Sequence, residues 1–122
     1  EVGDGIAASS VGSPGRTPSE VATGLSHTCV LFDNGQVRCW GANAFGALGD
    51  GTTTDRTRPV SVSNADGSAS LSAVTTVSAS PYRHSCALVD GDRVACWGYN
   101  LSGQLGDGTT TNRTRPVPVL AG

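Results

Sequence analysis

The sequence contains no methionine and no lysine, and only six of its 122 residues are aromatic. Without lysine the chain can form neither a Schiff base nor the phosphate-binding P-loop, because both need an ammonium side chain. No run of about 18 apolar residues occurs, which excludes a transmembrane helix. Since the chain lacks an initiator methionine, we expect it to be a processed mature protein or a segment of a longer one.

Charge is also sparse, at 15% charged residues and a net charge of −2. This mild acidity argues against a nucleic-acid-binding surface, which is normally basic. Glycine is abundant instead: the chain has 17 glycines and 6 prolines, more than globular proteins usually carry. The length suits one domain at most.

Four cysteines flank two hairpins of the same design, namely Cys29 with Cys39 and Cys86 with Cys96. In the first hairpin, residues 33–35 form a three-residue turn that ends with Gly35 in the left-handed conformation. Counting back from this turn places the two cysteines opposite each other, at a non-hydrogen-bonded pair with Cα atoms about 4.5 Å apart. The same count in the second hairpin requires Asp92 to take the left-handed position.

A disulfide can span that distance, so the favoured interpretation is two disulfides. In the chain-entropy model each would stabilise the fold by about 2.8 kcal/mol. Free thiols and a zinc site are the alternatives, and in the latter His27 or His84, each two residues before a cysteine, would be a ligand. Directly opposed cysteines are badly aimed for tetrahedral zinc. Disulfides would place the protein in the extracellular space, at the cell surface or in the periplasm.

Two copies of one pattern fill most of the chain, and residues 27–62 align with residues 84–119 at a constant offset of 57. A period near fifty with several short strands indicates propeller blades. Apolar residues occur on both faces of each hairpin, as in sheets that are covered on both sides. We predict strands at 20–23, 28–32, 36–40 and 58–61, and at 74–78, 85–89, 93–97 and 115–119.

The repeated residues carry a family resemblance. In the first copy they are Gly24, His27, Leu31, Gly35, Val37, Trp40, Gly41, Asn43, Gly46, Leu48, Gly49 and Gly51. The second copy departs at Pro81 and Asp92, where the first has Gly24 and Gly35. This pattern resembles the repeat of the regulator of chromosome condensation family. The resemblance implies four-stranded blades of a propeller, usually one of seven blades, and the hairpin cysteines resemble those of bacterial, extracytoplasmic members.

The expected fold is therefore all-β, with two four-stranded antiparallel propeller-like blades and a broken leading repeat. We assign residues 1–19 to the tail of a preceding repeat, 20–62 to blade 1 and 73–122 to blade 2. Residues 63–72 are expected to be a flexible Gly/Ser-type linker that lets the blades pivot.

A closed propeller needs about four to eight blades, so two blades are incomplete. The chain is then a fragment of a longer propeller, a subunit of a closed ring, or a subunit of a head-to-tail fibre. Both outer blade faces are expected to expose apolar residues.

No catalytic constellation or cofactor motif is present, so the sequence predicts no enzyme, no cofactor and no metal. Asp50 and Asp107 lie in Asp-Gly loops that offer calcium ligands, although capping of the turn by the carboxylate is the simpler interpretation. Trp40 and Trp97 offer a sugar-stacking surface or, more simply, part of the blade core.

Two further sets of residues are candidates for interaction. Two pairs of arginines are spaced by two residues and so share a strand face, namely Arg56 with Arg58 and Arg113 with Arg115. They either form a patch that binds a partner or make ion pairs with nearby aspartates. Asn100 and Asn112 begin glycosylation sequons.

The sequence thus predicts a non-catalytic extracytoplasmic module that acts in protein binding or self-assembly through its blade faces. Its partner is a second copy or the rest of a longer propeller, with no nucleic acid and no membrane span. The alternatives are a secreted inhibitor or adhesin fragment that binds through propeller-face loops, and a glycan- or calcium-binding lectin-like repeat. Disulfides argue against the exchange-factor activity on a nuclear GTPase that one family member has.

Overall fold

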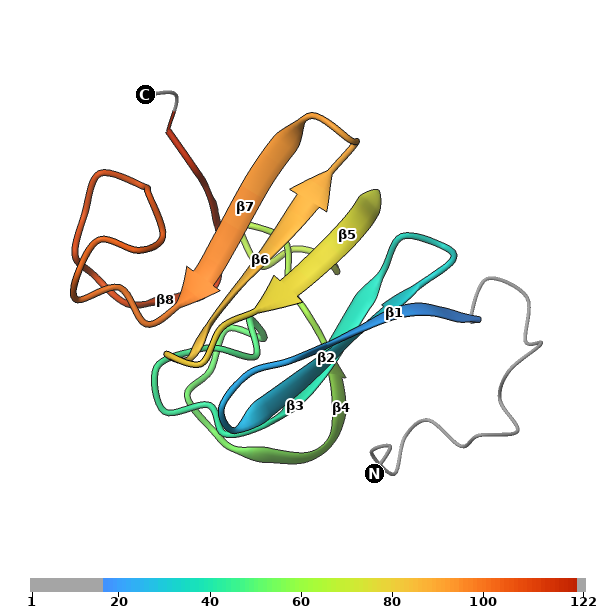
Figure 1. Cartoon of the computed structure of the whole chain (residues 1–122), viewed down its shortest axis with the longest axis horizontal. Coiled ribbons are helices and arrows are strands. Elements are labelled where there is room, and N and C mark those ends of the chain that lie inside the picture. The colour runs from blue at the N-terminus through green and yellow to red at the C-terminus, as the bar shows by residue number, and fades with distance from the viewer. Residues whose placement is uncertain (1–16, 121–122) are drawn as a thin grey trace.

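The computed structural model describes residues 17–120 and folds them into two four-stranded antiparallel sheets (Figure 1). The strand orders are β1-β2-β3-β4 and β5-β6-β7-β8, so each sheet is a simple meander. The first sheet comprises β1 (Pro18–Thr23), β2 (His27–Phe32), β3 (Val37–Gly41) and β4 (Arg56–Ser61). The second comprises β5 (Val74–Ala79), β6 (His84–Val89), β7 (Arg93–Gly98) and β8 (Arg113–Pro118). The predicted pair of all-β blades is confirmed, while most of the predicted leading repeat lies outside the described residues.

The first hairpin has the predicted register. Cys29 lies opposite Cys39, and the two form a disulfide with a Cα–Cα distance of 4.1 Å. Gly35 closes the turn with a φ of 82°, and its backbone N–H donates to the Phe32 carbonyl at 2.9 Å. The left-handed position therefore falls on the glycine, where it costs least.

The second hairpin also joins its cysteines, Cys86 and Cys96, but its turn differs from the prediction. The left-handed residues are Asp90 and Gly91, with φ of 56° and 78°, and not Asp92. The Asp92 N–H donates to the Val89 carbonyl at 3.2 Å. The connection still has three residues, because Val89 pairs with Arg93, but Asp90 and Gly91 form the turn, and Asp-Gly is a pair that hairpin turns favour. The loss of glycine at position 92 is thus compensated by the glycine one residue earlier.

The core lies between the two blades. In Figure 1, β5 lies beside β1 and β2, and the apolar side chains from both sheets form one buried cluster. The blade 1 members are Cys29, Leu31, Val37, Cys39, Leu48 and Val62, and the others are Leu71, Val74, Val77, Ala87, Val89 and Trp97. The Glu20 carboxylate adds a polar link, since it accepts a hydrogen bond from the Val77 backbone N–H at 3.1 Å.

The segment expected to be a flexible linker, residues 63–72, makes backbone hydrogen bonds at both of its ends. The Leu71 N–H donates to the Val62 carbonyl, and the Asn64 N–H donates to the Ala69 carbonyl, both at 2.8 Å. Leu71 is itself part of the interblade core. Its polar composition suggested a loose linker, but one leucine and the hydrogen bonds hold the segment in place.

The two outer faces differ, contrary to the expectation that both expose apolar residues. On blade 1, Val30 and Phe32 are buried and pack with the half-buried Trp40 in a second, smaller cluster. On blade 2, Val94 and Val119 are 44% and 39% exposed. Within residues 17–120, no helix is long and apolar enough to cross a membrane.

Candidate functional site

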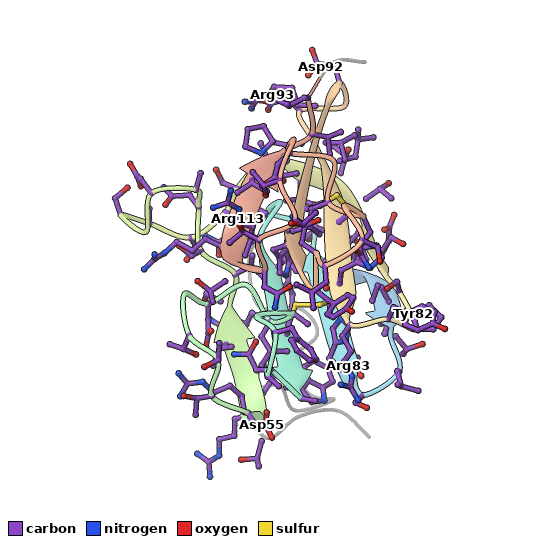
Figure 2. The ribbon with its side chains drawn as sticks, turned by 90° about the vertical axis from the view of Figure 1, so that its left-hand side faces the viewer. Asp55, Tyr82, Arg83, Asp92, Arg93 and Arg113 are labelled. Carbon is purple, nitrogen blue, oxygen red and sulfur yellow. A yellow bond between two sulfur atoms is a disulfide. The ribbon has the colours of Figure 1, made fainter. Side chains whose placement is uncertain are left out.

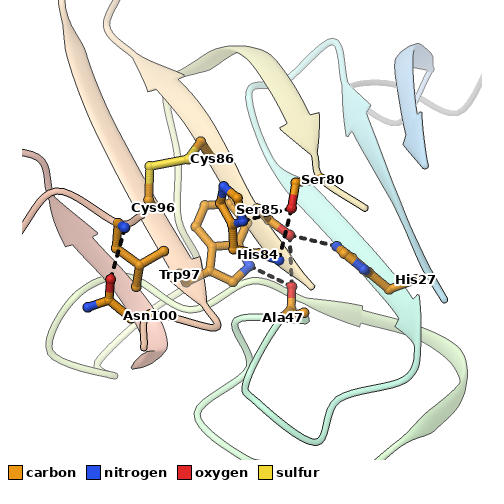
Figure 3. Close-up of a disulfide and its surroundings, with 10 residues drawn as sticks. His27, Ala47, Ser80, His84, Ser85, Cys86, Cys96, Trp97 and Asn100 are labelled. Carbon is orange, nitrogen blue, oxygen red and sulfur yellow. Dashed lines mark hydrogen bonds between the residues drawn. A yellow bond between two sulfur atoms is a disulfide. The ribbon is translucent and has the colours of Figure 1, made fainter. Parts of the chain in front are cut away.

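The joint between the blades is built around one backbone carbonyl, that of Ala47 in the loop after β3. It accepts hydrogen bonds from the Trp97 indole Nε1–H at 2.8 Å and from the Ser85 hydroxyl at 3.0 Å (Figure 3). The Ser85 Oγ also lies 2.9 Å from His27 Nε2. All four residues are buried. Blade 1 thus contributes a histidine and a carbonyl, and blade 2 contributes a hydroxyl and an indole.

Two signature residues of the repeat, His27 and Gly24, have a structural role in this joint. Burial lowers the pKa of His27, and the nearby His84 lowers it further, so the imidazole is neutral when it meets Ser85. Gly24 stands against the His27 ring, and a Cβ there would collide with it. His27, at the start of β2, is therefore a hydrogen-bonding residue of the joint.

Blade 2 repeats the blade 1 half of this joint on its outer side, without a partner. His84 is held through its Nδ1, 2.7 Å from the Ser80 hydroxyl, while its Nε2 has no partner among residues 17–120. Gln104 occupies the position of Ala47, and its carbonyl accepts no hydrogen bond from the described residues. Burial lowers the pKa of His84 as well. The outer side of blade 2 therefore carries a histidine and a carbonyl ready for a hydroxyl and an N–H.

Apolar residues surround these two groups. The face comprises the Cys86–Cys96 disulfide with Leu88, Val94 and Val119. Val94 and Val119 occupy the positions of Val37 and Val62, which are 1% and 0% exposed in the joint. They also line a groove of about 760 Å³, together with Leu71, Val89 and Ala95 at the edge of the interblade core. We call this surface the outer face of blade 2.

The loops between the third and fourth strands are held by a buried asparagine. Asn43 accepts from the Leu48 N–H at 3.0 Å and donates from its Nδ2 to the Thr52 and Thr54 carbonyls, both at 3.0 Å. Asn100 makes the same contacts in blade 2 and is fully buried. The asparagine thus closes each loop from within, and the blade 1 loop also bonds to blade 2, where the Gly51 N–H donates to the Thr114 carbonyl at 2.9 Å.

The predicted glycosylation at Asn100 does not fit this arrangement. Its amide nitrogen is the group that a glycan would occupy, and it is already committed to buried hydrogen bonds inside the loop. Asn112 is half-buried, and its Oδ1 accepts from the Asn100 N–H at 2.8 Å. Glycosylation at Asn112 stays a prediction.

The Asp-Gly loops use their carboxylates internally, in line with the turn-capping interpretation. Asp50 accepts from Thr52 and Asn43 through Oδ1, and from the Arg56 Nε–H at 3.0 Å through Oδ2. Burial alone would raise the pKa of Asp50, but these hydrogen bonds outweigh it and lower the pKa. Within residues 17–120 no cluster of three metal-ligating side chains occurs.

The equivalent carboxylate in blade 2 is held more strongly. The Thr109 hydroxyl and the Arg113 guanidinium, whose Nε lies 2.8 Å from the carboxylate, lower the pKa of Asp107 to about 2. Arg56 and Arg113 thus have intramolecular partners, as does Arg58. The Arg115 guanidinium packs against Gly51 and Gly67. The role of these four arginines as an interaction patch stays a prediction.

Four residues that sequence reasoning passed over gather at one end of the molecule: Phe45, Tyr82, Arg83 and Tyr99. The rings of Phe45 and Tyr99 meet edge to face, with centroids 5.0 Å apart, and the Arg83 guanidinium lies 5.5 Å from the Phe45 centroid. They occupy positions at which the two copies differ, so a search for shared signature residues could not find them. Comparison of the copies for their differences would have found them.

The arrangement of two meander blades with a buried histidine, a tryptophan and an asparagine at fixed repeat positions is matched by known proteins. The family described as Regulator of chromosome condensation (RCC1) repeat matches residues 34–88, and a second profile of that description matches residues 19–47 and 74–104. The chain belongs to the RCC1 repeat family. The predicted family is therefore confirmed.

Curated relatives share the RCC1 repeats over most of this chain. The Ultraviolet-B receptor UVR8 of Arabidopsis thaliana is 35% identical over 103 residues, which are 84% of this chain and 22% of UVR8. The probable E3 ubiquitin-protein ligase HERC4 of Homo sapiens is 41% identical over 100 residues, which are 81% of this chain and 9% of HERC4. The chain thus spans less than a quarter of the length of these relatives.

Solved structures share the fold. Human WBSCR16 superposes with a TM-score of 0.73 at 24% identity, over 89% of this chain and 28% of its own. Prp20p from Saccharomyces cerevisiae, whose binding to Gsp1p and histones was described with its structure, superposes with a TM-score of 0.70 at 15% identity. That match covers 87% of this chain and 26% of Prp20p. At these identities the likeness concerns the fold alone.

Proposed function

We propose that this chain is a non-catalytic RCC1-type propeller module that acts by binding protein, and that the outer face of blade 2 receives a further blade of the same kind. That blade belongs to a second copy or to the rest of a longer propeller. One observation carries the proposal: positions that are fully buried in blade 1 are exposed in blade 2. Val37 is 1% exposed and its counterpart Val94 is 44% exposed.

The kind of partner follows from what covers blade 1. Its buried face packs against Val74, Val77 and Trp97 of blade 2, which present an apolar surface. Since the outer face of blade 2 repeats the residues of that buried face, it suits the same covering surface. Exposed apolar area of this kind is typical of interaction sites.

Hydrogen bonding supports the same partner. In the joint, a hydroxyl and an indole N–H meet His27 and the Ala47 carbonyl. In a second copy, Thr28 and Trp40 occupy the positions of Ser85 and Trp97. Both are half-buried, so they would offer a hydroxyl and an indole N–H to His84 and the Gln104 carbonyl. Repeated addition gives a ring if it closes and a head-to-tail fibre if it does not.

We also propose an extracytoplasmic, bacterial-type location: extracellular, at the cell surface or in the periplasm. The support is chemical, because each hairpin carries a disulfide and such bonds persist in oxidising compartments. We keep the proposed division of the chain into blade 1 at 20–62, a connection at 63–72 and blade 2 at 73–122.

Sedimentation velocity over a range of protein concentrations tests the self-assembly. We expect the sedimentation coefficient to rise with concentration, and the variant Val94→Asp to remain monomeric. The matched control is Leu101→Asp, which places the same charge on a residue that is 58% exposed in the loop after β7. A wild-type chain that stays monomeric throughout, or equal assembly of Val94→Asp and wild type, would contradict self-assembly through this face.

A further inference from the structure

Half of the aromatic residues of this chain gather at one exposed place. Of the six aromatic residues, Trp97 and Phe32 are buried in the blades and Trp40 is half-buried. The other three line a cleft of about 330 Å³ together with two apolar residues and one arginine. We call this set the aromatic patch: Leu25, Phe45, Pro81, Tyr82, Arg83 and Tyr99.

The patch spans both blades. Leu25 lies in the turn before β2 and Phe45 in the loop after β3, while Tyr82 lies in the turn before β6 and Tyr99 directly follows β7. Leu25 is 63% exposed and Tyr82 is 75% exposed. Figure 2 shows Tyr82 pointing away from the body of the molecule, with Arg83 close to it.

The blade fold does not require these side chains. The other copy of the repeat has Ser102 at the position of Phe45, Leu25 at that of Tyr82, and Ala42 at that of Tyr99. Both blades nevertheless have the same strands and the same loop hydrogen bonds. Aromatic residues at these positions therefore need a reason other than folding.

The backbone holds the patch in a fixed shape. Arg83 has a φ of 70°, an unfavourable conformation for a residue with a side chain. The turn is fastened on both sides, because the Ser80 hydroxyl accepts from the Tyr82 N–H at 3.1 Å and the Arg83 carbonyl accepts from the Tyr99 N–H at 3.1 Å. A surface ordered before binding loses less entropy when its partner arrives.

Charge identifies the partner's chemistry. Arg56, Arg93 and Arg113 form ion pairs with aspartates, whereas Arg83 contacts the Phe45 ring and has no carboxylate partner among residues 17–120. An exposed guanidinium above apolar rings suits a partner carboxylate next to an apolar side chain. Tyrosine and arginine are also the residues that dominate binding energy in protein interfaces.

A carbohydrate suits the patch less well. Sugar hydroxyls need acceptors as well as donors, and sites built for them combine aromatic rings with polar side chains. The cleft is lined by no Asp, Glu, Asn or Gln, and its ionic side chain is a pure donor.

We propose that the aromatic patch is a docking site for an exposed segment of a partner protein in which an acidic residue adjoins an apolar one. The carboxylate pairs with Arg83, and the apolar side chain packs between Tyr82 and Tyr99. The patch does not include Val94 or Val119, so the variants that test it differ from those that test assembly.

Selection from a phage-displayed library of random short peptides on the immobilised full chain tests this. We expect enriched peptides to combine Asp or Glu with a neighbouring Leu, Phe or Tyr. Synthetic copies of them should bind about tenfold more weakly to Arg83→Gln and to Tyr82→Leu, the residue that the other copy carries. Circular dichroism melting curves verify that both variants fold.

The matched control is Arg93→Gln, which removes the same charge at the opposite end of the molecule in Figure 2 and should leave peptide binding unchanged. Enriched peptides without acidic residues, or equal affinity for wild type and Arg83→Gln, would overturn the proposal. Failure to enrich any peptide would do so too. Binding on a glycan array that is lost in the same variants would assign the patch to carbohydrate and overturn it as well.

Discussion

The two blades have nearly the same sequence but different surroundings. Cys29 and Cys39 are fully buried in the joint, whereas Cys86 is half-buried on the outer face of blade 2. Trp97 is fully buried and hydrogen-bonded, whereas Trp40 is half-buried and its indole N–H has no partner among residues 17–120. The face of blade 1 that blade 2 covers is therefore more deeply buried than the equivalent face of blade 2.

The loops show the opposite behaviour. The Leu48 N–H to Asn43 distance is 3.0 Å, and the equivalent distance from Leu105 to Asn100 is 2.9 Å. Each loop is closed by its own asparagine and aspartate, and the blade 1 loop also bonds to blade 2 through the Ala47 carbonyl and the Gly51 N–H. The internal contacts of the loops are therefore the same in both blades, whereas the burial of the faces differs with the contact between blades.

The largest difference between the blades should come from their tryptophans. Trp97→Ala removes a fully buried ring and its hydrogen bond to the Ala47 carbonyl, so we expect it to lower the free energy of unfolding by about 3–5 kcal/mol. Trp40→Ala removes a ring that is already half in solvent and should cost less than half of that. Urea unfolding followed by far-ultraviolet circular dichroism measures both.

Trp97→Phe is the control for the hydrogen bond, because it keeps most of the apolar area and removes the indole N–H. It should cost less than Trp97→Ala. Equal losses for Trp97→Ala and Trp40→Ala would show that the covered and the outer position contribute alike to stability.

The disulfides should differ next, in accessibility more than in contribution to stability. Each closes a loop with a sequence separation of 10, worth about 2.8 kcal/mol in the chain-entropy model. A reductant must reach the sulfur atoms, and those of Cys29 and Cys39 lie inside the joint. We expect mild reduction followed by alkylation and peptide mass mapping to label Cys86 and Cys96 first. Simultaneous labelling of both pairs would mean that the joint opens before either disulfide does.

The sequence was sufficient to predict what each repeat determines by itself. The Cys29–Cys39 register followed from one turn, and the four strands of each blade followed from the pattern. The order of segment 63–72 could not be predicted, because it depends on Leu71 reaching a core supplied by both blades. The aromatic patch could not be predicted from the sequence for a similar reason. Phe45 and Tyr99 are 54 residues apart in sequence, and only the packing of two blades brings them together.

A smaller difference should appear in acid. The pKa of Asp107 is lowered to about 2 from the usual 3.8, so the folded state binds fewer protons than the unfolded chain between those values. The associated stabilisation is complete above about pH 4 and is lost as the pH falls through about 2. Asp107→Asn should cost about 1 kcal/mol at neutral pH, since the Arg113 partner is partly exposed.

The measurement is urea unfolding from pH 6 down to about pH 2. Asp107→Asn should show a weaker loss of stability in acid than the wild type does. Asp50→Asn is the matched variant in blade 1, where the lowering of the pKa is smaller, and it should change the acid profile less. An Asp107→Asn profile that parallels the wild type would mean that this carboxylate has its ordinary pKa in the folded chain.

The smallest effect should come from the histidine of the joint. Burial, and then the neighbouring His84, lowers the pKa of His27 below its usual 6.5, so the folded state resists a proton that the unfolded chain accepts. Stability is therefore highest above about pH 6.5 and declines as the pH falls below it. His27→Gln keeps a hydrogen-bonding group near Ser85 and cannot titrate, so it should cost about 1 kcal/mol at pH 7.5 and lose part of this decline.

His84→Gln is the control on the outer face. If a further blade covers that face, a rise in protein concentration should move the titration of His84, followed by NMR, to lower pH, because the contact removes its imidazole from water. An unchanged His84 titration in an assembled sample would show that assembly uses another surface.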